Sequence, residues 1–445
     1  MREVFILNFK HKCVMLILLL LLICLSVGSV SASEDASGVS NTTTVLSESI
    51  GVDSGNDVVG GLESSVPEGD VLGADGDGTF TDLQNDINDA VNTGSVFNMN
   101  RSYIYTAGVD GEDLLYGVVV NGPLIINGNG TYYIDGAGVA RIMQIKADNV
   151  EVNKVTFQNG YRAFNTNDFQ GAAVYCENFN NLTFNTCKFT GNGQTVFYPG
   201  TTTRALALGL CIYANVGSNL NISDCTFTGV AGTGVNTGVG CFNVNDTTIY
   251  CCTFICLHNG IYVVNGNMIN MTRVAVSTSA SGSYGGNVTY NNYINKVLNI
   301  LIDHCNMGGT GTGNRFTLTN YLIYVRNTEY INVTNNNFHN FNGGYTVLDF
   351  GGIKYYAYIY NNIINDKRTE WNDGCRDISI AGVRSTANID FISNTIQNTG
   401  MQRSRCIYLS DFNNVLFDHF TLNAVRETSQ EREGVYCNNI NNFNP

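Results

Sequence analysis

The sequence is organised around the stretch Leu182-Thr183-Phe184-Asn185-Thr186-Cys187-Lys188-Phe189. Apolar residues hold its first, third, sixth and eighth positions. The same pattern occurs in ten copies, at residues 150–157, 182–189, 220–227, 247–254, 269–276, 300–307, 331–338, 357–364, 389–396 and 415–422. Thr247 opens one copy, and asparagine takes the sixth position at Asn336, Asn362 and Asn394. Such a repeat indicates a stack of similar units rather than one globular core.

Each copy is predicted to form a strand, a corner and a second short strand. The alternation of apolar and polar residues has the period of a strand with one buried face, and the two polar residues after it favour a bend. Six copies follow an asparagine, and one follows Asp246; the asparagines are Asn149, Asn181, Asn219, Asn299, Asn388 and Asn414. Asparagine tolerates left-handed backbone angles, and stacked amides can hydrogen-bond to each other. We therefore expect an asparagine column at one corner.

A second family of short strands precedes this column. Its members are Val174-Tyr175-Cys176, Ile212-Tyr213-Ala214, Ile261-Tyr262-Val263, Ile323-Tyr324-Val325, Ile407-Tyr408-Leu409 and Val435-Tyr436-Cys437. Three short parallel strands per turn predict an all-β protein, a parallel β-helix. The four prolines of the chain lie outside the repeats, as central strands require. A β-sandwich would show hairpin spacing and no column of identical positions.

The first 32 residues are predicted to be a signal peptide. Arg2, Lys10 and Lys12 form a basic flank, an apolar run spans residues 14–27, and small residues end at Ala32. The apolar run is shorter than the roughly 20 residues that span a bilayer, so an uncleaved anchor is the second interpretation. No later segment has the composition of a membrane span. We therefore expect a secreted protein, extracellular or associated with the cell surface.

Residues 33–78 are predicted to be a disordered acidic tether. Between residues 33 and 100 the chain has no Lys or Arg and is rich in Ser, Thr, Gly and acidic residues. The remainder is close to neutral although the whole chain has a net charge of -14. No basic stripe exists to neutralise phosphates, so nucleic acid is not an expected partner.

The β-helix domain is predicted to span residues 79–445 and to open with a capping helix over residues 79–93. Phe80, Leu83, Ile87 and Val91 fall on one helical face, the first turn is acidic, and Gly94 follows. Such a helix would cover the first open coil. Short strands between glycine and asparagine corners follow, before the clean repeats begin at residue 150.

The cysteines follow the repeat. Cys187, Cys225, Cys252 and Cys305 share the sixth position. Stacked rungs lie about 4.8 Å apart, which is longer than the roughly 3.8 Å between Cβ atoms that a disulfide prefers. We therefore expect buried free thiols rather than a disulfide framework. The full column should point inward: Val155, Cys187, Cys225, Cys252, Val274, Cys305, Asn336, Asn362, Asn394 and Phe420.

No metal or other cofactor is predicted. A metal site at Cys251, Cys252 and Cys256 is the sharper alternative to buried thiols, but its spacing matches no common zinc pattern.

Several segments carry a family resemblance. They are Phe80-Thr81-Asp82-Leu83-Gln84, Pro123-Leu124-Ile125-Ile126-Asn127-Gly128-Asn129-Gly130, Ile134-Asp135-Gly136 and the rungs of the type Asn-Leu-Thr-Phe-Asn-Thr-Cys-Lys-Phe. From Gly78 onward the sequence resembles the right-handed parallel β-helix (pectate-lyase-like) domain of the adhesin-like surface proteins of methanogenic archaea. The resemblance implies an extracellular protein that binds glycans or other cell surfaces through an extended face. It brings no catalytic residues.

The alternative function is a carbohydrate-active enzyme, a polysaccharide lyase or glycoside hydrolase. Such enzymes bring several acidic residues together on neighbouring rungs. Asp303-His304 and Asp418-His419 occupy the same corner and are weak catalytic candidates. They lie four rungs apart, which is about 19 Å, so they cannot form one site. Solvated turn residues are the plainer interpretation of both pairs.

A charged insertion at residues 366–377 holds the one tryptophan of the chain. Sugar-binding clefts combine an aromatic platform with carboxylates and arginine. The candidate ligand-binding residues are Glu370, Trp371, Asp373, Arg376 and Asp377. A charged loop whose tryptophan packs on the coil is the alternative.

Three Asn-x-Ser/Thr sequons are predicted to face outward and to accept glycans. Asn221, Asn270 and Asn332 each occupy the polar position inside the first strand of a copy.

The last residues align with the beginning of a rung. Residues 434–443 match residues 173–182, and neither an amphipathic helix nor a polar cap follows. An open rung would expose strand edges and apolar groups, including Ile440 and Phe443. We expect this polypeptide to self-associate through that end, or to be a shortened relative of a longer surface protein.

Overall fold

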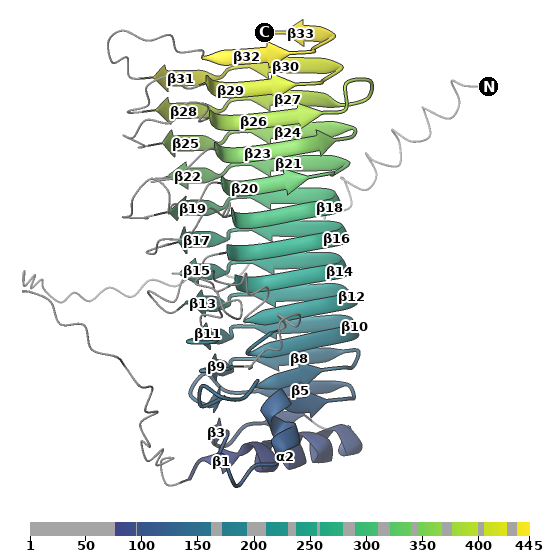
Figure 1. The fold of residues 1–445 in the computed structure, drawn as a ribbon, viewed down its shortest axis with the longest axis vertical. Helices are drawn as coiled ribbons and strands as arrows, with labels where there is room; N and C mark the ends of the chain where they lie inside the picture. Colours follow the sequence, from purple (N-terminus) through teal and green to yellow (C-terminus); the bar gives the residue numbers. More distant parts are fainter. Residues whose placement is uncertain are drawn as a thin grey trace, which may run out of the picture. The chain divides into compact units, whose positions relative to one another are not determined.

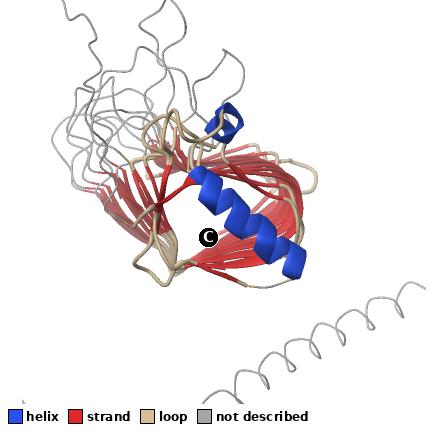
Figure 2. Cartoon of the chain, turned by 90° about the horizontal axis from the view of Figure 1, so that it is seen from below, coloured by secondary structure: helices blue, strands red, loops and turns tan. Residues whose placement is uncertain are grey.

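A computed structural model describes the chain at residues 76–94, 96–161, 171–193, 211–229, 237–255, 259–278, 290–309, 321–339, 346–366, 376–398, 405–424 and 434–445. Parallel strands stack into a solenoid, and helix α2 (Phe80–Thr93) lies across its first coil (Figures 1 and 2). The predicted all-β, right-handed parallel β-helix with a short N-terminal helix is confirmed.

Each coil contributes strands to three rows. The third row is one sheet of β1 (Gly78–Thr79), β3 (Tyr103–Ile104), β6 (Tyr133–Asp135), β9 (Thr156–Gln158), β11 (Lys188–Thr190), β13 (Thr226–Thr228), β15 (Thr253–Ile255), β17 (Ala275–Thr278), β19 (Asn306–Gly309), β22 (Asn337–His339), β25 (Ile363–Asp366), β28 (Thr395–Asn398) and β31 (Thr421–Ala424). The first row holds β4 (Val118–Val120), β7 (Met143–Ile145), β20 (Tyr321–Arg326), β23 (Thr346–Ile353), β26 (Arg376–Gly382), β29 (Arg405–Ser410) and β32 (Val435–Asn438). The second row holds β2 (Phe97–Asn98), β5 (Leu124–Asn127), β8 (Val150–Asn153), β21 (Tyr330–Thr334), β24 (Tyr356–Tyr360), β27 (Asn388–Ile392), β30 (Asn414–Asp418) and β33 (Asn442–Asn444).

In five middle coils the first and second rows join in one long bent strand, where the sequence predicts two separate strands. These strands are β10 (Val174–Asn185), β12 (Ile212–Ser223), β14 (Thr237–Tyr250), β16 (Asn259–Thr272) and β18 (Tyr290–Asp303). In β10, β12 and β14 two left-handed residues make the bend, such as Val216 and Asn219 in β12 with φ of 51° and 55°, whereas β16 and β18 have one each, Asn265 and Lys296. The pairing of β10 with β12 stays in register on both sides of the bend.

Helix α2 is capped as its sequence predicts. Thr79 accepts a hydrogen bond from the Asp82 backbone N–H, Asp82 accepts one from the Thr79 N–H, and Gly94 ends the helix at φ 62°. The buried residues of the helix are Phe80, Leu83, Ile87 and Ala90, whereas Val91, predicted to be buried, is half-buried against the core. The sequence places Gly78 in the tether, but in the structure Gly78 pairs with Tyr103 in the third row.

The predicted inward column is present. Every member from Val155 to Asn394 is at most 2% exposed, and Phe420, near the last coil, is half-buried. The three asparagines of this column hydrogen-bond to one another. Asn336 donates to Asn362 Oδ1, and Asn362 donates to Asn394 Oδ1, each at 2.9 Å. Each carbonyl also accepts the backbone N–H of the rung before it, and Cys225 Sγ accepts that of Cys187 at 3.3 Å. Thiol and amide therefore serve the same purpose, because both offer an acceptor to a buried N–H.

No disulfide joins the ten cysteines that the structure describes, so the predicted free thiols are confirmed for them. Burial raises the pKa of Cys211 and of Cys241 to about 12. Cys256, part of the alternative metal site, lies outside the described residues; within them, no three His, Cys, Asp or Glu side chains meet as a metal site. Cys211 and Cys241 are consequently protonated packing groups at neutral pH.

The predicted asparagine corner is present in part. Asn149, Asn181, Asn219 and Asp246 have φ between 55° and 59°, and Asn181 and Asn219 each donate to the amide one rung below at 2.9 and 3.0 Å. The remaining three asparagines, Asn299, Asn388 and Asn414, belong to strands β18, β27 and β30 and do not have a left-handed backbone. In those coils the left-handed residue falls earlier or the corner is longer, as with Lys296 at φ 56°.

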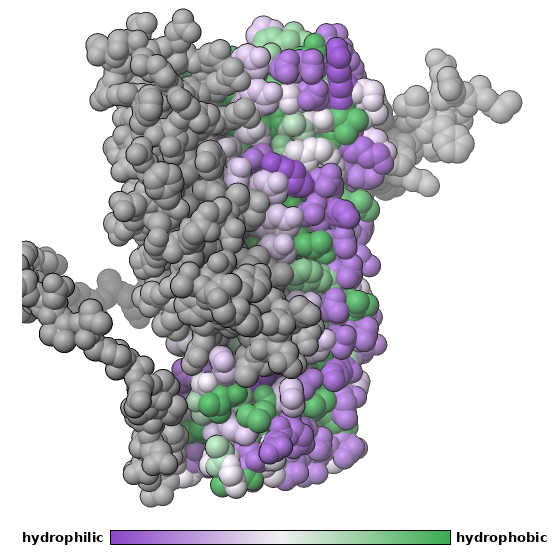
Figure 3. Space-filling model, viewed as in Figure 1, coloured by the Kyte–Doolittle hydropathy of each residue, from purple (hydrophilic) through white to green (hydrophobic). Residues whose placement is uncertain are grey.

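Hydrophilic and hydrophobic residues are interspersed over the described part of the surface in Figure 3. Within the described residues no helix has the length and apolar character needed to cross a membrane.

Candidate functional site

A column of aromatic side chains runs along the outer face of the first row. In-register pairing stacks the same outward position of successive coils, so Tyr175 lies against Tyr213, and Tyr293 lies between Tyr262 and Tyr324. In β14 that position is Gly240, and the ring of Phe242, two residues further along the strand, fills the place between Tyr213 and Tyr262. We call the column the aromatic ladder; it consists of Tyr175, Tyr213, Phe242, Tyr262, Tyr293 and Tyr324, with ring centroids 5.6, 5.1, 5.7, 4.5 and 5.5 Å apart in that order. Because the ring faces cover one another, the surface receives mainly ring edges and hydroxyls.

Arginine closes the ladder at both ends. The Arg141 guanidinium lies 4.8 Å from the Tyr175 ring centre, and that of Arg326 lies 3.8 Å from the Tyr324 ring centre. Arg326 also pairs with Asp349 at 3.0 Å. Cations over aromatic faces stabilise both partners and hold the terminal rings in place.

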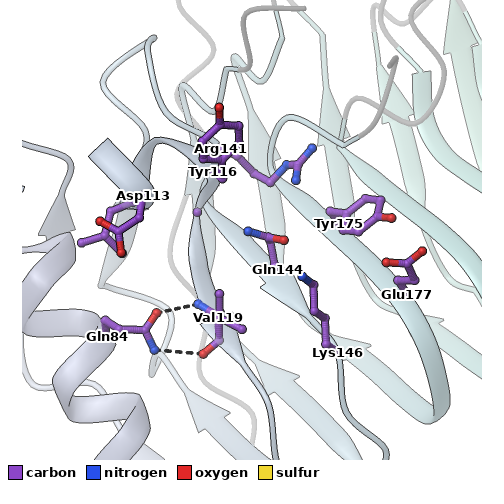
Figure 4. A pocket seen from close by; sticks show the side chains of 11 residues that line it. Gln84, Asp113, Tyr116, Val119, Arg141, Gln144, Lys146, Tyr175 and Glu177 are labelled. Carbon is purple, nitrogen blue, oxygen red and sulfur yellow. Dashed lines mark hydrogen bonds between the residues drawn. The ribbon is translucent and has the colours of Figure 1, made fainter. Parts of the chain in front are cut away.

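A pocket of about 470 Å³ opens at the N-terminal end of the ladder (Figure 4). Helix α2, the short helix η1 (Glu112–Tyr116) and strands β4, β7 and β10 supply its walls. It is lined by Gln84, Asp113, Leu114, Tyr116, Gly117, Val119, Arg141, Gln144, Lys146, Tyr175 and Glu177. The pocket therefore joins residues almost one hundred positions apart in the sequence.

Backbone hydrogen bonds hold the pocket walls together. Gln84 receives the Val119 N–H on Oε1 at 2.7 Å and donates Nε2 to the Val119 carbonyl at 3.0 Å, which ties the helix to the first coil (Figure 4). Arg141 is 2% exposed and donates Nε to the Gly171 carbonyl at 2.8 Å. A buried arginine held in this way is a preorganised cation at the pocket wall.

The pocket brings opposite charges together. Lys146 and Glu177 directly follow the paired residues Ile145 and Cys176, so they lie on neighbouring rungs. Burial, and then its hydrogen bond with Glu177, raises the pKa of Tyr175 to about 12. Tyr116, 52% exposed, adds an aromatic ring. The pocket therefore combines cations, carboxylates, an amide and an exposed aromatic ring in one concave site. Such a combination is typical of a site for a polar ligand.

The two Asp-His pairs lie where the sequence predicts. Pairing runs from Asp303 through Thr334, Tyr360 and Ile392 to Asp418, so the pairs are four rungs apart. The imidazole of each pair contacts its neighbouring carboxylate, at 2.7 Å for residues 303 and 304 and at 2.5 Å for residues 418 and 419.

Each of these pairs is explained by its corner. His304 and His419 have φ of 52° and 48°. Burial alone would raise the pKa of Asp303, but hydrogen bonds from Thr334 (2.5 Å), Asn335 (2.9 Å) and His304 lower it below its usual range. An ionised carboxylate committed to a turn is a structural group.

The insertion at residues 366–377 is only partly described. Glu370, Trp371 and Asp373 lie outside the described residues; the backbone of Arg376 begins β26, and Asp377 in β26 is fully buried. A ligand site at this insertion stays a prediction.

The three sequons occupy outward positions of the second row, as predicted. Asn221 and Asn332 are exposed, whereas Asn270 is half-buried and accepts a hydrogen bond from Thr272 Oγ1 at 2.7 Å. Their glycosylation remains a prediction.

No protein-family model and no curated protein sequence matches the chain. Among solved structures, tailspike protein 3 of bacteriophage CBA120 is similar with a TM-score of 0.36 and 12% identity over 82% of this chain and 62% of the tailspike. The A-module of the Azotobacter vinelandii mannuronan C-5 epimerase AlgE6 has a TM-score of 0.36 and 12% identity over 82% of this chain and 95% of the module. The family 28 exopolygalacturonase of Yersinia enterocolitica has a TM-score of 0.35 and 10% identity over 82% of this chain and 78% of that enzyme. What this chain binds has to be argued from its own side chains.

Proposed function

We propose that the protein is a secreted, adhesin-like cell-surface protein that binds a glycan in the pocket and along the aromatic ladder. The observation that carries the proposal is the pocket itself, which combines the exposed ring of Tyr116 with Arg141, Gln144, Lys146 and Glu177 at the end of a long column. Sugar hydroxyls need paired donors and acceptors, and sugar C–H faces need an aromatic ring.

The ladder gives such a glycan room to extend. It crosses six coils from β10 to β20, which is about 24 Å at the usual strand spacing. Its tyrosines are partly exposed beyond the buried Tyr175. Phenol hydroxyls repeated at rung spacing suit a polymer with a regular repeat of hydroxyl groups.

The test is a glycan array followed by calorimetry on the best ligand. Tyr116→Ala and Lys146→Ala are expected to weaken binding about tenfold each, since one removes a ring and the other a cation from the pocket. The matched control is Tyr250→Ala, because Tyr250 is an exposed tyrosine (37%) on the second row. Glycan binding that both pocket variants leave intact would overturn the proposal.

A carbohydrate-active enzyme is the second candidate, favoured by one observation. Asp113 and Glu177 place two carboxylates in the same pocket beside Arg141 and Lys146, and hydrolases and lyases use paired ionisable groups of this kind. Incubating array-positive polysaccharides with the protein and with Glu177→Gln decides between the two. Shortened products that Glu177→Gln fails to form favour the enzyme, and unchanged chain length favours the adhesin.

A further inference from the structure

A second tyrosine cluster lies on a different outer face, that of the second row. Tyr356, Tyr358 and Tyr360 project from alternate positions of β24. Their ring centroids are 6.5 and 5.6 Å apart and their planes are within 11° of each other. Tyr330, 43% exposed, pairs with Tyr356 through the backbone, and its ring lies 5.4 Å from that of Tyr355. We call these five residues the tyrosine cluster.

Carboxylates surround the tyrosine cluster. Asp390 pairs with Tyr358 on the next rung and accepts a hydrogen bond from the Tyr356 hydroxyl. Glu329 precedes Tyr330 at the corner, and Asp303 lies two rungs from Tyr360 in the same column. The face therefore combines aromatic rings with carboxylates.

The cluster already holds one ammonium group. Lys354 lies with Nζ 4.6 Å from the centre of the Tyr355 ring and 2.9 Å from Glu329 Oε1. On the same row, the guanidinium of Arg273 lies 5.9 Å from the centre of the Tyr250 ring. Two cations of this chain thus use tyrosines of this face in the way an external cation would.

We propose that the tyrosine cluster, when no glycan occupies the neighbouring sequon residue Asn332, binds a polymer of amino sugars that carries free ammonium groups. Charge complementarity selects a cation, since Glu329 and Asp390 lie beside the exposed ring of Tyr330 and the half-buried rings of β24. Three rings spaced 6.5 and 5.6 Å apart along one strand favour a chain of several sugars over a single sugar. The pocket, with Arg141 and Lys146, carries cations of its own and is a separate site.

The experiment compares chitosan oligomers with chitin oligomers of the same length by calorimetry at low salt. The two ligands differ in whether the amino group is a charged ammonium or an uncharged amide. We expect the chitosan oligomer to bind at least about tenfold tighter, and its affinity to fall as salt screens the carboxylates. Equal affinity for both oligomers would overturn the proposal.

Variants separate this site from the pocket and from general attraction. Tyr358→Ala and Asp390→Asn should each weaken chitosan binding about fivefold, whereas Lys354→Ala should strengthen it, because the ligand's ammonium takes the vacated place between Tyr355 and Glu329. Tyr116→Ala in the pocket should leave chitosan binding unchanged. Binding that Asp390→Asn weakens but Tyr358→Ala does not, matched by an oligolysine peptide, would mean plain charge attraction and contradict an amino-sugar site. If the amino-sugar proposal for the tyrosine cluster fails, the proposal that the pocket binds a glycan is unaffected.

Discussion

At the scale of single residues, the backbone angle is constant while the side chain varies. The corner after each second-row strand is left-handed in residues as different as Lys154, Thr186, Arg273 and His304, with φ between 52° and 56°. Only small polar residues and glycine adopt this region readily, so the others are strained. The two histidines of the predicted Asp-His pairs belong to this set of corner residues, and a catalytic role for them stays a prediction.

Val216, at the corner between the first and second rows, is also left-handed and gives a prediction. It is β-branched, 46% exposed and at φ 51°, whereas Asn178 and Asn243 hold the matching corners of the coils before and after it. Val216→Asn should stabilise the protein by about 1 kcal/mol, because asparagine relieves the strain. The measurement is the urea midpoint of unfolding. The control is Val383→Asn, an exposed valine without positive φ, and a gain no larger than that of the control would contradict the prediction.

The buried asparagine column gives the opposite prediction. Asn362 Oδ1 accepts from the backbone and the side chain of Asn336, and its Nδ2 donates to Val333 and Asn394. Asn362→Leu should destabilise by about 3 kcal/mol or more, because each buried polar group left unpaired costs about 1–3 kcal/mol. The control is Asn337→Ala, which removes one exposed hydrogen bond from the Asn337 side chain to Asn306 Oδ1. It should change the free energy of unfolding by less than about 0.5 kcal/mol. Equal losses for the two variants in urea unfolding would show that the column is dispensable.

At the scale of the strands, the sequence predicts the strands correctly where buried and exposed side chains alternate over a few residues. The h-x-h-x-x-h-x-h pattern predicts both strands and their corner, because burial alternates in each strand. It misses the fusion of two rows in β10 to β18, since left-handed corner residues such as Lys296 and Val216 are not typical turn residues. The pattern likewise treats Asn336 as an exception, because its hydrogen bonds go to residues of neighbouring coils, which one copy of the repeat does not reveal.

The thiols of these strands predict alkaline sensitivity. Burial raises the pKa of Cys211, Cys241 and Cys305 from 9.0 to about 12. Below pH 9 both states keep the proton; between pH 9 and pH 12 the unfolded state releases it while the folded state does not, so stability falls as pH rises through this window. The urea midpoint should drop there, and less steeply in Cys241→Ala. A midpoint that is constant up to pH 12 would contradict this.

At the scale of the whole molecule, the site is less predictable than the fold. The sequence marks the Ile-Tyr-Val strands, but that their tyrosines stack outward into one ladder follows from register across six coils. The pocket joins Gln84 to Glu177 only because α2 folds back over the first coil. The charged insertion attracts attention in the sequence, whereas Arg141 and Lys146 are isolated there.

The last coil predicts association. Strands β32 and β33 pair on one side with β29 and β30, and Phe443 is 49% exposed. We propose that the edge formed by β32 and β33 pairs with a second copy of this chain, because strand groups that have no partner among the described residues, together with apolar side chains, are then buried. Light scattering should show concentration-dependent growth that Phe443→Lys reduces and Val139→Lys, an equally exposed valine (46%), does not. A stable monomer at high concentration would contradict it.

The measurement that tests the account most directly is the affinity of the array-selected glycan as a function of its length. A glycan that starts in the pocket and follows the aromatic ladder should bind more tightly with each added sugar until the ladder is spanned, about 24 Å. Tyr262→Ala should remove the gain for long oligomers and leave short ones unaffected, since Tyr262 lies three coils from Tyr175 along the ladder. Affinity that stops rising after one or two sugars, or that Tyr262→Ala lowers equally at every length, would contradict a ladder that binds glycan.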